Sequence, residues 1–160
     1  MDVKIKSKEG NFKMRVAGCI IKDDKLLTVN IGDNGFYCLP GGHVHLGESS
    51  IDSINREIKE EVNINIKDIK LISIIENFFL DKENKVFHEL CYVYVVYPSD
   101  DIEIKDYSIV ENDEGVLRNL EFKWIHLDEL RNSNFRPEIL IDKLERRNYE
   151  FEHIVFDKTK

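Results

Sequence analysis

The segment from Gly42 to Ile64 constrains this chain more than any other, and it reads GHVHLGESSIDSINREIKEEVNI. After Gly47 it contains no glycine or proline, and Ser49 or Ser50 could cap the start of a helix. Its apolar residues recur at steps of three, four and four, which is the spacing of one stripe on a helix with 3.6 residues per turn. The segment therefore predicts an amphipathic helix over residues 50–62, with a stripe of Ile51, Ile54, Ile58 and Val62.

Three glutamates lie beside this stripe. At about 100° per residue, Glu57, Glu60 and Glu61 would spread over an arc of roughly 100° on one side of the helix. Like charges one turn apart repel by about 0.2–0.5 kcal/mol per pair, and a bound cation reverses that cost. Carboxylate oxygens suit a hard ion, Mg²⁺ or Mn²⁺. The simpler alternative is a solvated acidic face, but Glu48 and Arg56 at fixed distances from the cluster favour a metal site.

With these residues in place, the segment resembles the Nudix box, the loop–helix–loop motif of the Nudix hydrolases. The family pattern is G-x5-E-x7-R-E-U-x-E-E-x-G-U, with U a bulky aliphatic residue. Every fixed position matches except the second glycine, which is Asn63 here. That position favours a left-handed backbone, and asparagine is the commonest non-glycine residue to accept it. The flanks Leu39–Gly42 and Phe122–Leu130 are similar to the family as well, so the resemblance covers roughly residues 12–145.

The resemblance implies roles for the residues of the box. It implies hydrolysis of the pyrophosphate bond of a nucleoside diphosphate linked to another moiety, with Mg²⁺ or Mn²⁺ as cofactor. Arg56 would hold a box glutamate in position, and Glu48 would be a supporting carboxylate. The metal ligands would be the carbonyl of Gly42 and the carboxylates of Glu57, Glu60 and Glu61.

A general base must take a proton from the attacking water, directly or through one other water. Within the box, Glu57 or Glu60 could serve. In some family members the base comes from a later loop, and residues 98–114 are rich in acids. Glu111 and Glu114 are the candidates there, and the alternative is a solvated acidic loop.

Three further residues are candidates for substrate binding. Arg15, in an early strand, could meet a phosphate, although a surface or edge arginine is the alternative. His45 could touch substrate or the Glu48 carboxylate, or belong to a polar loop. With His43 it forms an H-x-H that could suit zinc, but no third ligand follows at a convincing spacing. Phe78 could stack on a base, with a place in the core as the alternative.

Around the box we expect strands at 12–21, 25–31 and 36–39, a hairpin of 69–79 with 86–97, and a strand at 121–126. A second amphipathic helix should begin at Pro137, and residues 152–156 form either a terminal strand or an irregular tail. Strands interleaved with two helices predict an α/β (α+β) fold. The resemblance implies an α/β/α sandwich with a mixed sheet between helices. The length of 160 residues favours one domain, with a core at about 12–145 and a tail at 146–160.

The net charge of −8 disfavours nucleic acid polymers and anionic membranes as partners. No apolar stretch is long enough to span a bilayer, and the charged start MDVKIKSKEG does not resemble a secretion signal. Three cysteines without a C-x-x-C motif suit the reducing cytoplasm. We expect a cytoplasmic enzyme with a small nucleotide substrate, and the family allows a homodimer. The alternative function is a catalytically inactive nucleotide-binding or regulatory domain, although all box glutamates are kept.

Overall fold

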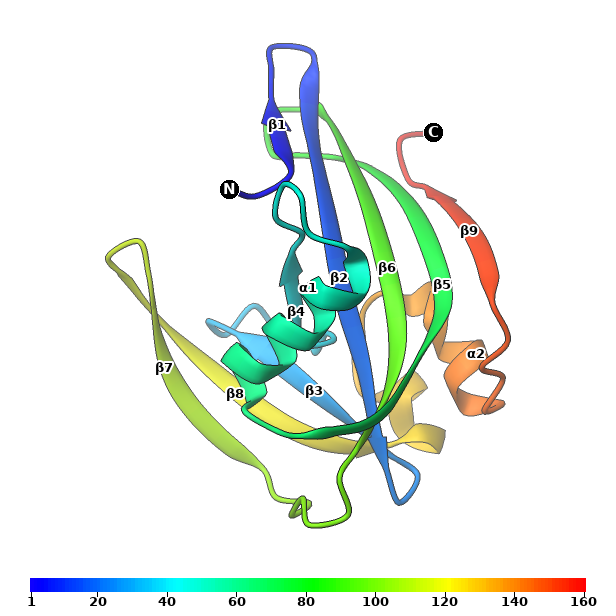
Figure 1. Cartoon of the computed structure of the whole chain (residues 1–160). Coiled ribbons are helices and arrows are strands. Elements are labelled where there is room, and N and C mark those ends of the chain that lie inside the picture. Colours follow the sequence, from blue (N-terminus) through cyan, green and yellow to red (C-terminus); the bar gives the residue numbers. More distant parts are fainter.

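A mixed β-sheet forms the centre of the fold in the computed structural model, which describes residues 1–160 (Figure 1). The main path of the sheet runs β7-β8-β3-β2-β6-β5-β9, and β1 and β4 pair with β2 off this path. β2 pairs with β6 and β5 with β9 in parallel, and all other pairs are antiparallel. The strands are β1 (Lys4–Lys6), β2 (Gly10–Lys22), β3 (Lys25–Ile31), β4 (Gly41–His43), β5 (Ile66–Leu80), β6 (Val86–Pro98), β7 (Tyr107–Asp113), β8 (Val116–His126) and β9 (Glu152–Asp157).

Helices lie on both faces of this sheet, as the alternation of side chains along β2 shows. Val16 and Ile20 pack in one core cluster with the box helix, whereas Ala17 and Cys19 pack in another with the C-terminal helix. The α/β/α sandwich with a mixed sheet is thus confirmed. The helical elements are α1 (Ser50–Glu57), the π-helix η1 (Ile58–Val62), the 3₁₀ helices η2 (Leu127–Asn132) and η3 (Glu138–Leu140), and α2 (Ile141–Glu145). None of them is long and apolar enough to cross a membrane.

The box helix sits close against β2 because Gly18 has no side chain. A Cβ atom there would lie 3.0 Å from Ile58 Cδ1 and 3.4 Å from Ile54 Cδ1. Both isoleucines are fully buried, and each such burial contributes about 1.5–3 kcal/mol. Ile51, which the spacing placed on the same stripe, is 46% exposed, so only part of the predicted stripe packs inward.

The expected strand at 36–39 is wrong. Cys38 forms an isolated bridge to Val29 of β3, and Tyr37 forms one to Phe135 in the connection between η2 and η3, so the segment makes single bridges and no strand. The strand in this region is β4, which begins at Gly41, after the expected segment, and pairs with β2.

The interpretation of residues 98–114 as an acidic loop is also wrong for its second half. Residues 107–113 form β7, which pairs with β8 and projects from the body as a hairpin (Figure 1). The strand expected at 121–126 therefore begins at Val116. Apolar residues such as Val110 remain 68% exposed along this hairpin, so the usual burial pattern of a strand is weak here.

The C-terminal elements differ from expectation in detail. Pro137 does precede a helix, but the first turn is the 3₁₀ helix η3 and only residues 141–145 are α-helical. Of the two alternatives for residues 152–156, the strand is correct. β9 lies parallel to β5 and closes that edge of the sheet.

Candidate active site

The box helix changes its winding in the middle. Ser49 caps α1 by accepting a hydrogen bond from the backbone N–H of Asp52 at 3.2 Å. After Glu57 the backbone follows a π-helix, in which the N–H of Asn63 bonds the carbonyl of Ile58 at 2.9 Å. Asn63 has the left-handed φ of 56° that its position predicts. The prediction of a continuous α-helix over 50–62 was therefore wrong. The wider π turn also changes the angles between Glu57, Glu60 and Glu61 around the helix axis.

Arg56 is the centre of the ion-pair network behind these glutamates. Its Nε and Nη2 donate to the two oxygens of Glu48 at 2.8 and 2.9 Å, which is a bidentate pair. Its Nη1 donates to Glu57 at 2.7 Å and to Glu60 at 3.3 Å. The hydrogen bonds from Arg56 hold the pKa of Glu48 at about 2, so this carboxylate is ionised at neutral pH. The contact of Arg56 with box glutamates that the resemblance implies is present.

The glycine turn contacts two of the glutamates directly. A Cβ atom on Gly42 would overlap the carboxyl group of Glu57, so that carboxyl group can lie where it does only beside a glycine. The backbone N–H of Gly41 donates to Glu61 Oε2 at 2.9 Å. The pairing of β4 with β2 fixes the position of this turn along β2, because Gly42 lies opposite Val16.

Glu61 is a partly buried carboxylate with a raised pKa. Burial raises its pKa to about 7, with smaller contributions from the charges of Glu57 and Glu111, while the Gly41 N–H and Arg15 act in the other direction. A carboxylate held in this way gains from any cation that enters beside it.

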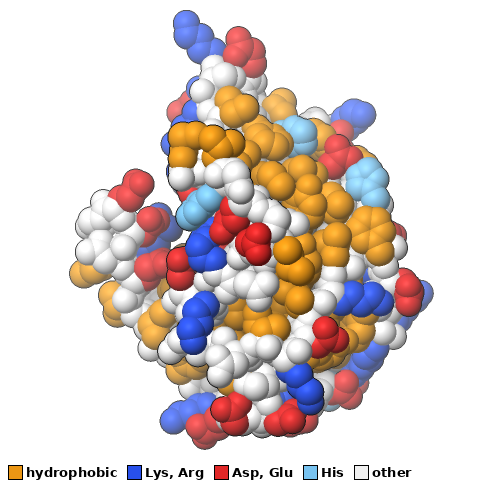
Figure 2. Space-filling view, viewed as in Figure 1, with side chains coloured by type: hydrophobic (Ala, Val, Ile, Leu, Met, Phe, Trp, Pro, Cys, Tyr) orange, Lys and Arg blue, Asp and Glu red, His pale blue; other side chains and the backbone are white.

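The glycine turn and the three glutamates of the box helix line a cavity of about 400 Å³, which we call the carboxylate cavity. In Figure 2 acidic side chains of the body face the projecting β7–β8 hairpin across a hollow. The lining residues are Asp2, Lys13, Arg15, Ile31, Gly41, Gly42, His43, Glu57, Glu60, Glu61, Glu111, Asp113, Arg118 and Leu120.

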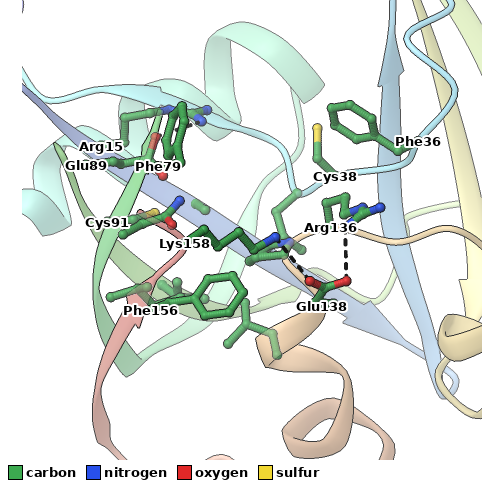
Figure 3. A pocket seen from close by; sticks show the side chains of 17 residues that line it. Arg15, Phe36, Cys38, Phe79, Glu89, Cys91, Arg136, Glu138, Phe156 and Lys158 are labelled. Carbon is green, nitrogen blue, oxygen red and sulfur yellow. Dashed lines mark hydrogen bonds and ion pairs between the residues drawn. The ribbon is translucent and has the colours of Figure 1, made fainter. Parts of the chain in front are cut away.

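A second cavity of about 440 Å³, which we call the apolar cavity, lies on the side of the sheet that carries η3 (Figure 3). Arg15 of β2 lines both cavities, so this residue lies between the two spaces. The apolar cavity is lined by Arg15, Ala17, Phe36, Cys38, Leu39, Ile75, Asn77, Phe79, Glu89, Cys91, Val93, Arg136, Pro137, Glu138, Leu140, Phe156 and Lys158.

The structure brings together most of the site residues expected from the sequence, but not all of them. Glu111 lines the carboxylate cavity, whereas Glu114 lies in the turn between β7 and β8. His45 lines neither cavity; its backbone N–H donates to Glu48 at 3.0 Å. Phe78 also lines neither cavity; its ring stacks on that of His88, with centroids 4.4 Å apart. The H-x-H motif is joined by Asp2, but no three side chains lie close enough to enclose a metal ion.

Several residues at the cavities were not identified from the sequence. Asp113 and Arg118 form an ion pair of 2.9 Å on the hairpin. Alternation along 107–113 could have placed Asp113 on the same face as Glu111, had that segment been read as a strand. The residues of the apolar cavity come from six separate parts of the chain, and no local pattern indicates them.

The NUDIX domain family model matches residues 12–144. The chain belongs to the NUDIX family. This Nudix protein is 28% identical over 127 residues to the uncharacterized Nudix hydrolase YvcI of Bacillus subtilis (strain 168), which is 79% of this chain and 74% of that one. Over 52 residues, 31% of each chain, it is 42% identical to the ADP-ribose pyrophosphatase of Methanocaldococcus jannaschii.

Among solved structures, the Nudix fold of this chain is similar to the crystal structure of the mutator MutT protein from Bacillus halodurans. The TM-score is 0.67 at 14% identity, and 91% of each chain is covered, so this likeness concerns the fold. The resemblance drawn from the box and the enzyme class that it implies, a hydrolase of phosphoanhydride bonds, are therefore confirmed at the level of the family.

Proposed function

We propose that this Nudix hydrolase cleaves the pyrophosphate bond of a nucleoside diphosphate linked to another moiety. The observation that carries the proposal is the anchoring of two carboxylates on one glycine turn: Glu57 lies against Gly42, and Glu61 accepts from Gly41. Both line the carboxylate cavity, which offers space beside them for phosphate groups. The partial match to an ADP-ribose pyrophosphatase supports this class of bond.

The oxygen atoms of this cavity fit a hard divalent cation, Mg²⁺ or Mn²⁺. No three side chains enclose an ion as they stand, but Glu60 is 62% exposed and its contact with Arg56, at 3.3 Å, is the longest that Arg56 makes to the box glutamates, so its side chain can turn toward a cation. When bound, the ion would neutralise phosphate charge and lower the pKa of a water molecule. We assign its ligands to the carbonyl of Gly42 and the carboxylates of Glu57, Glu60 and Glu61.

The remaining residues position and polarise the reactants. Arg56 holds Glu57 and Glu48 in place through the contacts described above. Arg15, which borders both cavities, would contact a phosphate oxygen and so set the position of the diphosphate. Glu111 faces the same space from β7 and is our first candidate for the base that deprotonates water, with Glu57 and Glu60 as the alternatives within the box.

The apolar cavity would then receive an aromatic part of the substrate. It adjoins the carboxylate cavity at Arg15 and carries three phenylalanines, so a flat ring would find apolar walls there. Phe79 lines this cavity and its neighbour Phe78 does not, so we now favour Phe79 for stacking on a base. Location in the cytoplasm and a homodimer remain predictions.

A panel of nucleoside diphosphate derivatives, assayed with Mg²⁺ for nucleotide and phosphate products, tests the proposal. We expect hydrolysis that disappears in Glu61→Gln and persists in the control Glu129→Gln, an exposed acid outside both cavities. Nucleotide binding without turnover in the unchanged protein would instead support the inactive binding domain. Equal turnover by Glu61→Gln and the unchanged protein would contradict the assignment of the site.

A further inference from the structure

Lys158 lies beyond the region that matches the family, yet its side chain enters the apolar cavity. We propose that Lys158 is a specificity-determining residue, which favours substrates whose aromatic ring presents carbonyl oxygens over those that present amino groups. This inference rests on the proposed function, because it names the class of ring that the apolar cavity receives.

The backbone of Lys158 is held in place at the end of β9. Its N–H donates to the carbonyl of Phe78 at 2.8 Å, which continues the parallel pairing of β9 with β5. From this point the side chain extends across the cavity to the opposite wall, where Nζ donates to Glu138 Oε1 at 3.1 Å (Figure 3). Nζ also lies 4.7 Å from the ring centroid of Phe156. Lys158 is thus directed into the cavity by its own strand.

The polar groups around Lys158 carry an excess of positive charge. Arg136 donates to Glu138 Oε2 at 3.0 Å, so both oxygens of this carboxylate already accept a bond from a cation. The hydrogen bond from Lys158 holds the pKa of Glu138 below its ordinary value, so Glu138 is ionised at neutral pH. Two cations therefore share one carboxylate at this end of the cavity.

At the other end of the cavity Glu89 is likewise paired with two basic side chains. Its Oε2 lies 2.9 Å from Lys13 Nζ and 3.9 Å from Arg15 Nη1. Lysine and arginine have three and five N–H donors and no acceptor. Most of the hydrogen-bonding capacity left free around the cavity is therefore donor capacity, which is met by oxygen acceptors on a ligand.

The pair of Lys158 with Glu138 can yield to a ligand at low cost. The two side chains are 44% and 50% exposed, and ion pairs in such surroundings contribute little to stability. Lys158 can therefore exchange or share its partner with a ring carbonyl. An exocyclic amino group at the same place would bring one donor against another and leave both unpaired.

The chemistry of this site thus fits uracil or hypoxanthine better than cytosine or adenine. Uracil and cytosine are the sharpest comparison, because they differ in the carbonyl or amino group at one ring position. A carbonyl-bearing ring in the second moiety would satisfy the same donors. The contribution of such a ring to the preference is measured by varying the second moiety while the base stays constant.

The test compares hydrolysis of UDP-glucose and CDP-glucose by the unchanged protein and by three variants. We expect the unchanged protein to prefer UDP-glucose by about tenfold in kcat/KM, the effect of one hydrogen bond to a charged group. Lys158→Met should remove this preference by raising KM for UDP-glucose toward the value for CDP-glucose, and Lys158→Arg should restore most of it. The matched control is Lys160→Met, since Lys160 is 87% exposed and pairs only with Asp157.

A preference that is the same in Lys158→Met and in the unchanged protein would overturn the inference, as would an equal loss for both substrates. The discrimination is also measured without turnover, as the Kd of UDP and of CDP. If no derivative is hydrolysed but UDP still binds more tightly and Lys158→Met removes the difference, the proposed function fails and the inference stands. If hydrolysis depends on Glu61 but neither Kd nor KM depends on Lys158, the proposed function stands and the inference about Lys158 fails.

Discussion

The carboxyl group of Glu57 occupies the place where a side chain on Gly42 would begin. Glu57 is held there from its other side by Arg56, whose Nη1 donates to it at 2.7 Å. A residue of the loop and a residue of the helix are thus fitted to each other across the glycine turn. A side chain at Gly42 would therefore collide with Glu57, although the backbone of Gly42 is not left-handed.

Gly42→Ala tests this relationship. The methyl group would displace the Glu57 carboxylate, and a shift of about 1 Å at a catalytic group costs on the order of 10²-fold in rate. We therefore expect kcat/KM to fall by about 10²-fold. The control Gly32→Ala places its methyl group in open space and should lower only the Tm slightly, because φ there is 58°. Retention of full activity by Gly42→Ala would show that Glu57 is not needed in its present position.

Arg56→Lys should lower both stability and activity, since lysine cannot reproduce the bidentate contact with Glu48. The guanidinium is only 22% exposed, and a lost hydrogen bond to a charged group costs about 1.5–3 kcal/mol. Urea unfolding measures the change in free energy. Arg131→Lys, at an arginine that is 57% exposed, is the matched control and should change it little. If the free energy of unfolding of Arg56→Lys equals that of Arg131→Lys, the ion-pair network around Arg56 does not stabilise the fold.

The position of Glu111 in the carboxylate cavity predicts unequal effects for two neighbouring acids. If Glu111 is the base, Glu111→Gln should reduce kcat by about 10²–10⁴-fold, the usual contribution of general base catalysis. Glu114→Gln should leave kcat unchanged, because that residue lies in the hairpin turn. Steady-state kinetics of both variants decide the matter. A normal kcat for Glu111→Gln would return the role to Glu57 or Glu60.

Metal binding should be visible without any substrate. An ion bound only by the folded protein raises the Tm as its concentration exceeds the Kd. We expect Mg²⁺ to raise the Tm of the unchanged protein and of Glu129→Gln, but not of Glu61→Gln, and EDTA to abolish turnover. Thermal unfolding with and without Mg²⁺ measures this effect. A Tm that is indifferent to Mg²⁺ and Mn²⁺ in every variant would argue against the assigned ligands.

Acidification should weaken the folded state through Glu89. Burial raises the pKa of this carboxyl group, but the nearby Arg15 and Lys13 outweigh burial and hold the pKa below its ordinary value of 4.5. Because the folded-state pKa is the lower one, the stabilising contribution is full above the unfolded value and is lost as the pH falls through the folded value. Glu89→Gln should therefore be less stable than the unchanged protein at pH 7, and the difference should shrink below about pH 4. A constant difference across this range would exclude the linkage.

The elements predicted correctly are those whose causes lie close together in the chain. Ser49 caps α1, Asn63 takes the left-handed backbone, and Arg56 reaches Glu48, all within a span of about four helical turns. The π-helix could not be predicted, because apolar spacing does not distinguish it from an α-helix over five residues. The β7–β8 hairpin was not predicted, because its apolar side chains are exposed and its many acidic residues are typical of a loop.

By itself the sequence determined the family, the box helix, the set of box carboxylates and the strands with buried alternating residues, because these depend on spacing along the chain. Only the tertiary structure decided that Arg15 borders two cavities, that Glu111 rather than Glu114 faces the carboxylates, and that Lys158 reaches Glu138. These relationships depend on strand pairings between distant segments, β2 with β6 and β5 with β9, and on a projecting hairpin. Such pairings are selected by the packing of the whole sheet, which no local pattern contains.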